Sequence, residues 1–175
     1  MSRRSFFKFR SGLGLAEALI SLAITTALLT AVASAFQASA AAVSQNDEFF
    51  RATQSARVAM ARLLTQIRRG AVDQPAATSA IRIITAGTPP TGGQDLTYQW
   101  NTTTKKLMMI TNDDLTDPDY TLASNVTDVV FTAQMGKDYN NADCVTRIAV
   151  QIAVTVGKNQ IRLSGSAAPR RNMTY

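Results

Sequence analysis

The chain has 175 residues, a formal net charge of +6, one Cys and no His. This length allows one domain with an extended element, the single Cys excludes an internal disulfide, and the absence of His removes the commonest general base and zinc ligand. Four of the 18 Lys and Arg residues lie in the first twelve positions, so 14 face 12 acids beyond them. That near balance argues against a general nucleic-acid-binding surface.

A basic leader, residues 1–12, precedes a long apolar run. The leader ends in Gly12 and contains Arg and Lys but no acid, whereas Glu17 is the only charged residue from Leu13 to Val43. Basic residues before an apolar segment predict a cytoplasmic N-terminus. A carboxylate near the end of a membrane-length helix is costly unless it is neutralised or paired, so we expect Glu17 to be functional.

One long helix is predicted from Leu15 to Arg69, because this segment contains no Gly and no Pro. Its first part, residues 13–45, is apolar around its circumference and is long enough to cross a membrane once. The second part, residues 46–70, is amphipathic and ends at Gly70, which suits a helix stop. We expect its apolar stripe to cover the core of the following domain; the stripe is formed by Phe49, Thr53, Ala56, Met60, Leu63 and Ile67.

Short strands are predicted in residues 71–175, where Thr, Asn, Asp, Val and Ile replace Ala and Leu. Alternating apolar residues and intervening turns indicate two hairpins. The expected fold class is therefore α+β, a long N-terminal helix packed on a C-terminal antiparallel β-sheet. The expected strands are Ile81–Ala86, Leu96–Trp100 paired with Leu107–Ile110, Val129–Ala133, and Ile148–Val156 paired with Ile161–Leu163.

Three interpretations of the N-terminus compete. It is a secretory signal peptide cleaved near Ala35 or Ala40, an uncleaved single-pass anchor, or a leader removed after Gly12 that leaves the apolar helix on the mature protein. The apolar run is longer than an ordinary signal peptide needs, and Glu17 lies at its start. We favour the third interpretation.

The stretch from Ser11 to Ile24, SGLGLAEALISLAI, resembles the prepilin N-terminal motif of type IV pilins and type II secretion pseudopilins. In that family a basic leader ends in Gly, the next residue is apolar, and Glu is fifth in the mature chain; counted from Leu13, Glu17 is fifth. The motif departs from the family's usual pattern at Leu13, Gly14 and Ala16. The segments from Ala56 to Ala71, from Asp95 to Trp100 and from Leu122 to Asp128 resemble J-type minor pseudopilins and PilW-type minor pilins more weakly.

This resemblance implies a pilin-like fold and a structural rather than enzymatic role. It implies cleavage between Gly12 and Leu13 by prepilin peptidase, N-methylation of Leu13, and a role for Glu17 in subunit register during assembly. The implied partners are the peptidase, other major and minor pilins or pseudopilins, and an inner-membrane assembly platform. The chain would cross the bacterial inner membrane once, with residues 71–175 in the periplasm, and stand in a type II secretion pseudopilus or type IV pilus, near the tip. No specific nucleic acid is expected as a partner.

The main alternative is a membrane-anchored periplasmic module that binds DNA, calcium or a secreted substrate. Asp113, Asp114, Asp117 and Asp119 crowd one segment and are weak candidates for Ca²⁺. Because their spacing matches no defined calcium loop and such residues are common in turns, we expect a solvated turn and no cofactor. We expect Cys144 to be a small buried residue and Arg170 and Arg171 to be a soluble tail. Without His, a Ser nucleophile lacks its usual base, and no catalytic motif is present.

Overall fold

The computed structural model describes residues 14–72, 78–85, 94–114, 116–137 and 140–170. Helix α1 runs without interruption over Leu15–Arg69. The chain divides into two compact units, Met1–Ser44 and Gln45–Tyr175. The predicted helix bounds are confirmed, and the backbone N–H of Gly70 closes the last turn on the carbonyl of Gln66 at 2.8 Å.

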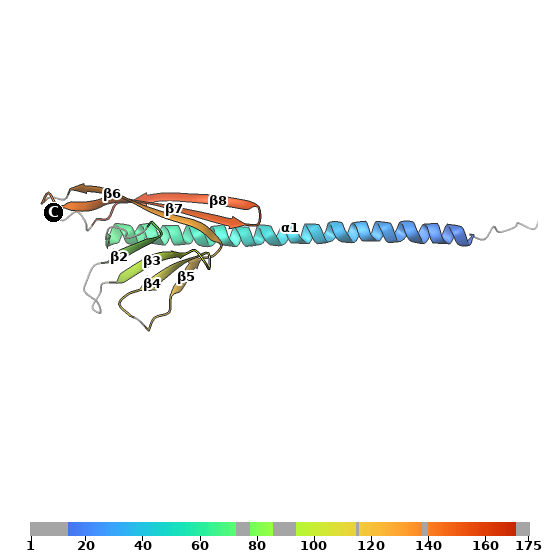
Figure 1. Cartoon of the computed structure of the whole chain (residues 1–175), viewed down its shortest axis with the longest axis horizontal. Helices are drawn as coiled ribbons and strands as arrows, with labels where there is room; N and C mark the ends of the chain where they lie inside the picture. Colours follow the sequence, from blue (N-terminus) through green and yellow to red (C-terminus); the bar gives the residue numbers. More distant parts are fainter. Residues whose placement is uncertain (1–13, 73–77, 86–93, 115, 138–139, 171–175) are drawn as a thin grey trace, which may run out of the picture. The chain divides into compact units, whose positions relative to one another are not determined.

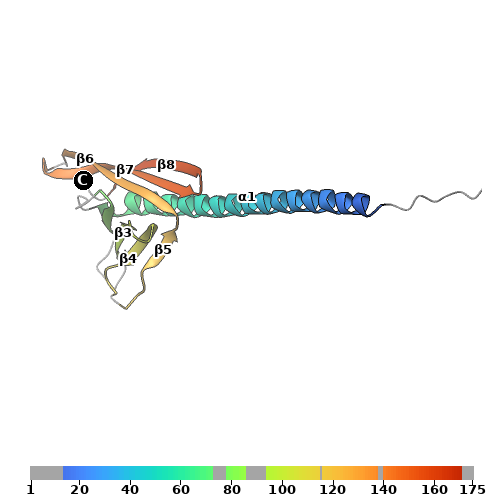
Figure 2. The same ribbon diagram turned by 45° about the vertical axis from the view of Figure 1, so that its right-hand side comes forward.

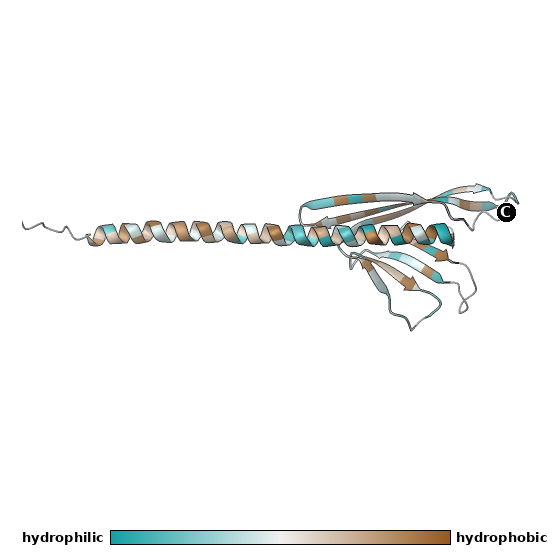
Figure 3. Ribbon diagram, turned by 180° about the vertical axis from the view of Figure 1, so that it is seen from behind, coloured by the Kyte–Doolittle hydropathy of each residue, from teal (hydrophilic) through white to brown (hydrophobic). Residues whose placement is uncertain are grey.

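The first unit contributes the N-terminal part of α1. All of its described side chains are exposed, including the large apolar ones from Leu15 to Val43. The helix contains an 18-residue window with a mean hydropathy of 2.0, so it is apolar and long enough to cross a membrane. Figure 3 shows this part mostly in brown and white, and strongly hydrophilic residues gather beyond it.

The second unit places the C-terminal part of α1 between two antiparallel sheets (Figures 1 and 2). The first sheet has the order β1-β2-β3-β4-β5 and the second the order β6-β7-β8. The α+β class is confirmed, but the strands form two sheets where the sequence led us to expect one. The strands are β1 Ala71–Val72, β2 Ala80–Ile84, β3 Asp95–Asn101, β4 Lys106–Thr111, β5 Tyr120–Ala123, β6 Val126–Lys137, β7 Asp143–Val156 and β8 Asn159–Ala167.

Both predicted hairpins are present. In the first, Tyr98 on β3 pairs with Met109 on β4, and the Asn101 side chain accepts the backbone N–H groups of Thr103 and Thr104 at 3.0 Å each. In the second, Val156 on β7 pairs with Asn159 on β8 around Gly157, whose φ of +58° suits a residue without a Cβ. The strand predicted at Ile81–Ala86 is β2, which ends at Ile84, and its expected last residue lies outside the described residues.

A single cluster of buried side chains joins α1 to both sheets. It contains Leu63 of α1, Tyr98 of the first sheet and Ile148 of the second, each fully buried. The predicted helix stripe is buried except at Phe49, which is partly buried at its edge. Two glycines show how closely the sheets approach the helix: an added Cβ would lie 2.6 Å from Ile83 at Gly70 and 2.8 Å from Leu64 at Gly165.

The chain crosses from the first sheet to the second between β5 and β6. Asn125 makes this crossing in a left-handed conformation, with φ +58°, which Asn tolerates better than most residues. Its side-chain amide donates to Glu48 of α1 at 3.0 Å, and its carbonyl accepts the N–H of Thr155 at 3.1 Å. Trp100 on β3 donates its indole N–H to the carbonyl of Val126 at 3.1 Å. The crossing is therefore tied to the helix and to both sheets.

Candidate functional site

The strongest candidate from the sequence, Glu17, lies in the first turn of α1. Its carboxylate accepts the backbone N–H of Gly14 at 3.3 Å, and the N–H of Ala18 reaches the carbonyl of Gly14 at 3.2 Å. A Glu at this helix position satisfies one of the free N–H groups of the first turn and lies at the positive end of the helix dipole. Gly12 and Leu13, the predicted cleavage and methylation sites, lie outside the described residues.

Glu17 is the one charge in an exposed apolar surface. Leu15, Leu19 and Ile20 beside it are each more than half exposed. One peptide N–H at 3.3 Å is a weak partner for a carboxylate removed from water, so burial of this helix end would require a cation or a proton. A carboxylate in this position is chemically suited to pair with an amine brought to the helix end.

Four hydroxyl side chains of this part of α1 are hydrogen-bonded within the helix. Thr25 donates its hydroxyl to the carbonyl of Ser21 at 2.7 Å, and Thr30 donates to Thr26 at 2.8 Å. Thr26 and Ser34 do the same to carbonyls three residues earlier, at 2.9 Å each. Such bonds let hydroxyl side chains enter hydrocarbon without an unpaired polar group. Glu17 therefore stands out as the group whose charge requires an external partner.

The acidic segment forms a set of local turn contacts. Asp114 accepts the hydroxyl and the N–H of Thr116 at 2.6 and 2.9 Å, and these bonds lower the pKa of Asp114. Asp117 accepts the Tyr120 hydroxyl at 2.7 Å, which raises the pKa of Tyr120. Asp113 accepts the N–H of Asp95 at 2.7 Å, and Asp119 is exposed. Among the described residues no group of three or more His, Cys, Asp or Glu is placed to hold a metal ion.

The structure also shows where Cys144 and Arg170 lie. Cys144 lies on β7 opposite Gly136 and is only partly buried, so our expectation of a buried thiol is wrong. It is the second residue of β7. At this point β7 pairs with β6 but not with β8, so Cys144 is less covered than residues in the middle of the sheet. Arg170 is exposed, and Arg171 lies outside the described residues.

An ion pair that the sequence analysis missed lies in the first sheet. Arg82 on β2 contacts Asp95 on β3 through two guanidinium nitrogens, with Nε 2.9 Å from Oδ1. Asn112 donates to the same carboxylate at 2.7 Å, and Asp95 is 9% exposed. Arg82, together with Asn112, holds the pKa of Asp95 below its usual value. Only the strand register brings these residues together, so spacing along the sequence gives no signal for the pair.

A polar pocket of about 240 Å³ lies between α1 and the first sheet. Arg62 of α1, Thr111 of β4 and Tyr120 of β5 contribute to its lining. Tyr98, which pairs with the lining residue Met109, is fully buried, and its hydroxyl makes no hydrogen bond within the described residues. Burial raises the pKa of Tyr98, and the nearby Arg62 opposes this effect.

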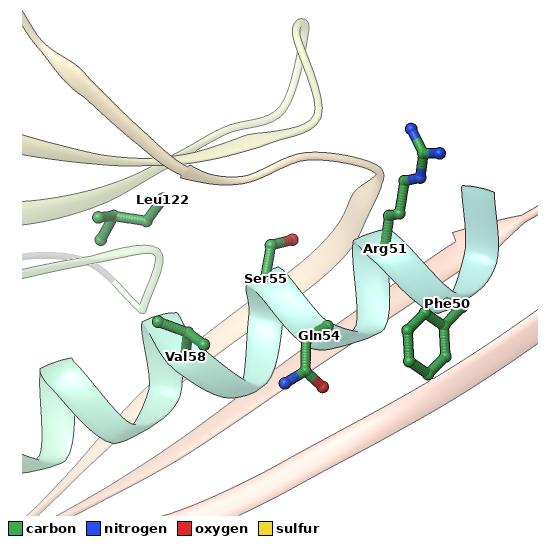
Figure 4. Close-up of a pocket in the computed structure, with 6 residues that line it drawn as sticks. All are labelled: Phe50, Arg51, Gln54, Ser55, Val58 and Leu122. Atoms are coloured by element: carbon green, nitrogen blue, oxygen red, sulfur yellow. The ribbon is translucent and has the colours of Figure 1, made fainter. Parts of the chain in front are cut away.

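A second, apolar pocket of about 380 Å³ lies where α1 faces β5. Figure 4 shows its lining, with Leu122 of β5 facing Val58 and Ser55, and Phe50 two turns earlier on the helix. Phe50 and Val58 are 68% and 60% exposed, although both lie in the folded second unit. The apolar stripe predicted from the sequence includes neither Phe50 nor Val58. The spacing of Phe50 and Val58, eight positions apart, could have indicated a second apolar face on this helix.

Comparison with known proteins adds no relative: no family model, curated protein or solved structure matches this chain.

Proposed function

We propose that this chain is a minor pilin or pseudopilin, a structural subunit of a type II secretion pseudopilus or type IV pilus. The observation that carries the proposal is Glu17, a lone carboxylate in the first turn of an exposed apolar helix. It follows a basic leader and stands fifth after Gly12, as in the prepilin motif. The described part of the structure supplies it with one peptide N–H and no cation.

The proposed maturation creates the partner that Glu17 requires. Prepilin peptidase cuts between Gly12 and Leu13 and methylates the new amine of Leu13. In a filament, the cationic amine of one subunit then pairs with the Glu17 carboxylate of its neighbour, and the low dielectric strengthens the pair. The pair sets the axial register of neighbouring helices.

The basic leader supports the proposed topology. Its four cations hold the N-terminus on the cytoplasmic side, α1 crosses the inner membrane once, and the β-rich domain lies in the periplasm. Small side chains along the apolar helix, such as Ala23, Ala27 and Ala31, allow helices to approach closely after assembly. Other pilins or pseudopilins and the inner-membrane assembly platform are the proposed partners.

The first test is the intact mass of the protein purified from membranes of its native host. Cleavage after Gly12 removes residues 1–12 and methylation adds one methyl group, whereas an uncleaved anchor retains its full mass. A cut near Ala35 or Ala40 would indicate a secretory signal. Gly12→Leu should retain the leader.

The second test is incorporation of Glu17→Ala into filaments, measured by its share of the sheared filament fraction. We expect insertion into the membrane to continue and incorporation to fall by about tenfold or more, because a desolvated amine without its carboxylate is strongly unfavourable. Thr26→Ala is a matched control, since its hydroxyl bonds only within its own helix. Normal incorporation of Glu17→Ala would contradict the proposal.

A membrane-anchored binding module remains a second candidate, and the polar pocket beside Arg62 and Tyr120 favours it. This candidate expects the full chain in lipid nanodiscs to bind Ca²⁺, DNA or a secreted protein, with Arg62→Ala weakening the binding. Strong, salt-dependent DNA binding would favour it over the filament subunit.

A further inference from the structure

The outward face of α1 in the second unit has an unusual composition for a helix surface in water. Phe50 and Val58 lie eight residues apart on one face, with exposed Gln54 between them. Leu122 of β5 borders the same apolar pocket. About 20 residues from Leu15 suffice to cross the hydrocarbon, so lipid does not account for exposed apolar side chains at positions 50 and 58.

This face is rimmed by arginines. Arg51 lines the pocket, and Arg57 and Arg62 are exposed on the same helix, one residue before Val58 and four residues after it. Arg68 and Arg69 continue the basic surface to the helix end. We call Phe50, Val58 and Leu122, with Arg51, Arg57 and Arg62 around them, the arginine-rimmed groove.

The acids of the same helix segment do not balance these charges. From Gln45 to Arg69 the helix has five Arg and only Asp47 and Glu48 as acids. Asp47 pairs with Arg51 at 2.7 Å, and Glu48 accepts the amide of Asn125. Among the described residues, Arg57, Arg68 and Arg69 make no ion pair.

We propose that the arginine-rimmed groove binds an acidic amphipathic helix of a different protein. Apolar positions at helical spacing favour a helix as the occupant, because the eight residues from Phe50 to Val58 correspond to a rise of about 12 Å, or about two turns of a partner helix. A strand would need the edge of β5, which is only four residues long. A second copy would bring arginines against arginines, and like charges disfavour that pairing.

This inference rests on the proposed function only for the partner's identity, a neighbouring subunit of another type. The groove lies wholly within the second unit. Its binding is therefore measurable in a chain whose Glu17 is replaced, so the two proposals can fail separately.

The test uses the full chain in nanodiscs of zwitterionic phosphatidylcholine. The probes are two dye-labelled 21-residue helical peptides with the same Leu stripe, one with Glu and the other with Lys on the flanking positions. Fluorescence anisotropy gives both affinities, with empty nanodiscs to subtract lipid binding. We expect the Glu peptide to bind about tenfold more tightly than the Lys peptide, and the preference to shrink at high salt.

Variants locate the binding. Val58→Ser and Phe50→Ser change exposed side chains and should each weaken the Glu peptide about fivefold or more, because the apolar contact is lost. Arg57→Glu should weaken it similarly, whereas Arg147→Glu, an exposed Arg on β7, is the matched control and should have no effect. The fluorescence of Trp100 checks that each variant is folded.

Three outcomes would overturn the inference. The first is equal affinity for both peptides or none for either. The second is equal weakening by Arg57→Glu and Arg147→Glu, which would indicate a diffuse charge effect. The third is self-association of the chain that Val58→Ser abolishes, which would make a second copy the occupant.

Discussion

The two parts of α1 are both rich in apolar side chains, but only one of them buries these side chains within the chain. In the first unit every described side chain from Leu15 to Val43 is exposed, although most are apolar. In the second unit the helix buries one stripe, from Ala52 to Ile67, against two sheets. The second part therefore obtains its apolar environment from its own chain, while the first, which belongs to a helix apolar and long enough to cross a membrane, has its side chains exposed. One uninterrupted helix can thus serve as a core element and as an assembly or membrane element.

The sharpest test of this comparison is truncation of one Leu in each part. Leu63→Ala should lower the free energy of unfolding of the second unit by about 2–5 kcal/mol, because Leu63 is fully buried between both sheets. Leu28→Ala, at a residue 62% exposed, should change it by less than about 0.5 kcal/mol. Urea unfolding of the full chain in detergent, followed by Trp100 fluorescence, measures both. Similar losses would show that the first part is also buried within the chain.

The partly buried ion pair between Arg82 and Asp95 should give a smaller effect. Asp95→Asn removes the carboxylate charge that Arg82 and Asn112 contact and should cost about 1–3 kcal/mol. Asp143→Asn is the control, because Asp143 and Lys137 form an ion pair at 2.8 Å with both side chains more than half exposed. That change should cost less than about 1 kcal/mol. Urea unfolding followed by Trp100 fluorescence measures the free energy of unfolding of both variants.

The ion pair between Asp95 and Arg82 also predicts that the free energy of unfolding depends on pH. The pKa of Asp95 is lowered in the folded state, so its contribution is fully present above the unfolded value of about 3.9 and is lost as the pH falls through the folded value. Between pH 7 and pH 3, the wild type should lose more stability than Asp95→Asn. Parallel pH curves for the two proteins would contradict this assignment.

The smallest expected effect is at the crossing between the sheets. Asn125→Ala removes the amide that reaches Glu48 and places a Cβ residue at φ +58°, and it should cost about 1–2 kcal/mol. Asn125→Gly keeps the backbone conformation at little cost and removes only the hydrogen bond. Thermal unfolding of the two variants separates these contributions. Equal stabilities would assign the whole effect to the bond with Glu48.

Much of the fold could be predicted from local patterns. The absence of Gly and Pro from Leu15 to Arg69 fixes the helix, and period-two alternation locates β3, β4, β7 and β8. The division into two sheets could not be predicted, because it depends on the turn at Asn125, and nothing in the local pattern excludes pairing of β5 with β6 in one sheet. The Arg82–Asp95 pair and the groove at Leu122 depend on register and packing between distant segments. Glu17 was identifiable because a lone charge in an apolar run is visible without any tertiary information.

The hydroxyls bonded inside α1 have one more consequence. In a bilayer, four hydroxyl side chains need no partner from surrounding chains, because they bond to carbonyls of their own helix. Rotation of the helix about its axis, or sliding along it, therefore breaks none of these bonds, which are made by Thr25, Thr26, Thr30 and Ser34. Resistance to such movement then comes from hydrocarbon contact, which varies smoothly, and from one carboxylate at the helix end. Such a helix can rotate and slide with little resistance until its one carboxylate meets a partner.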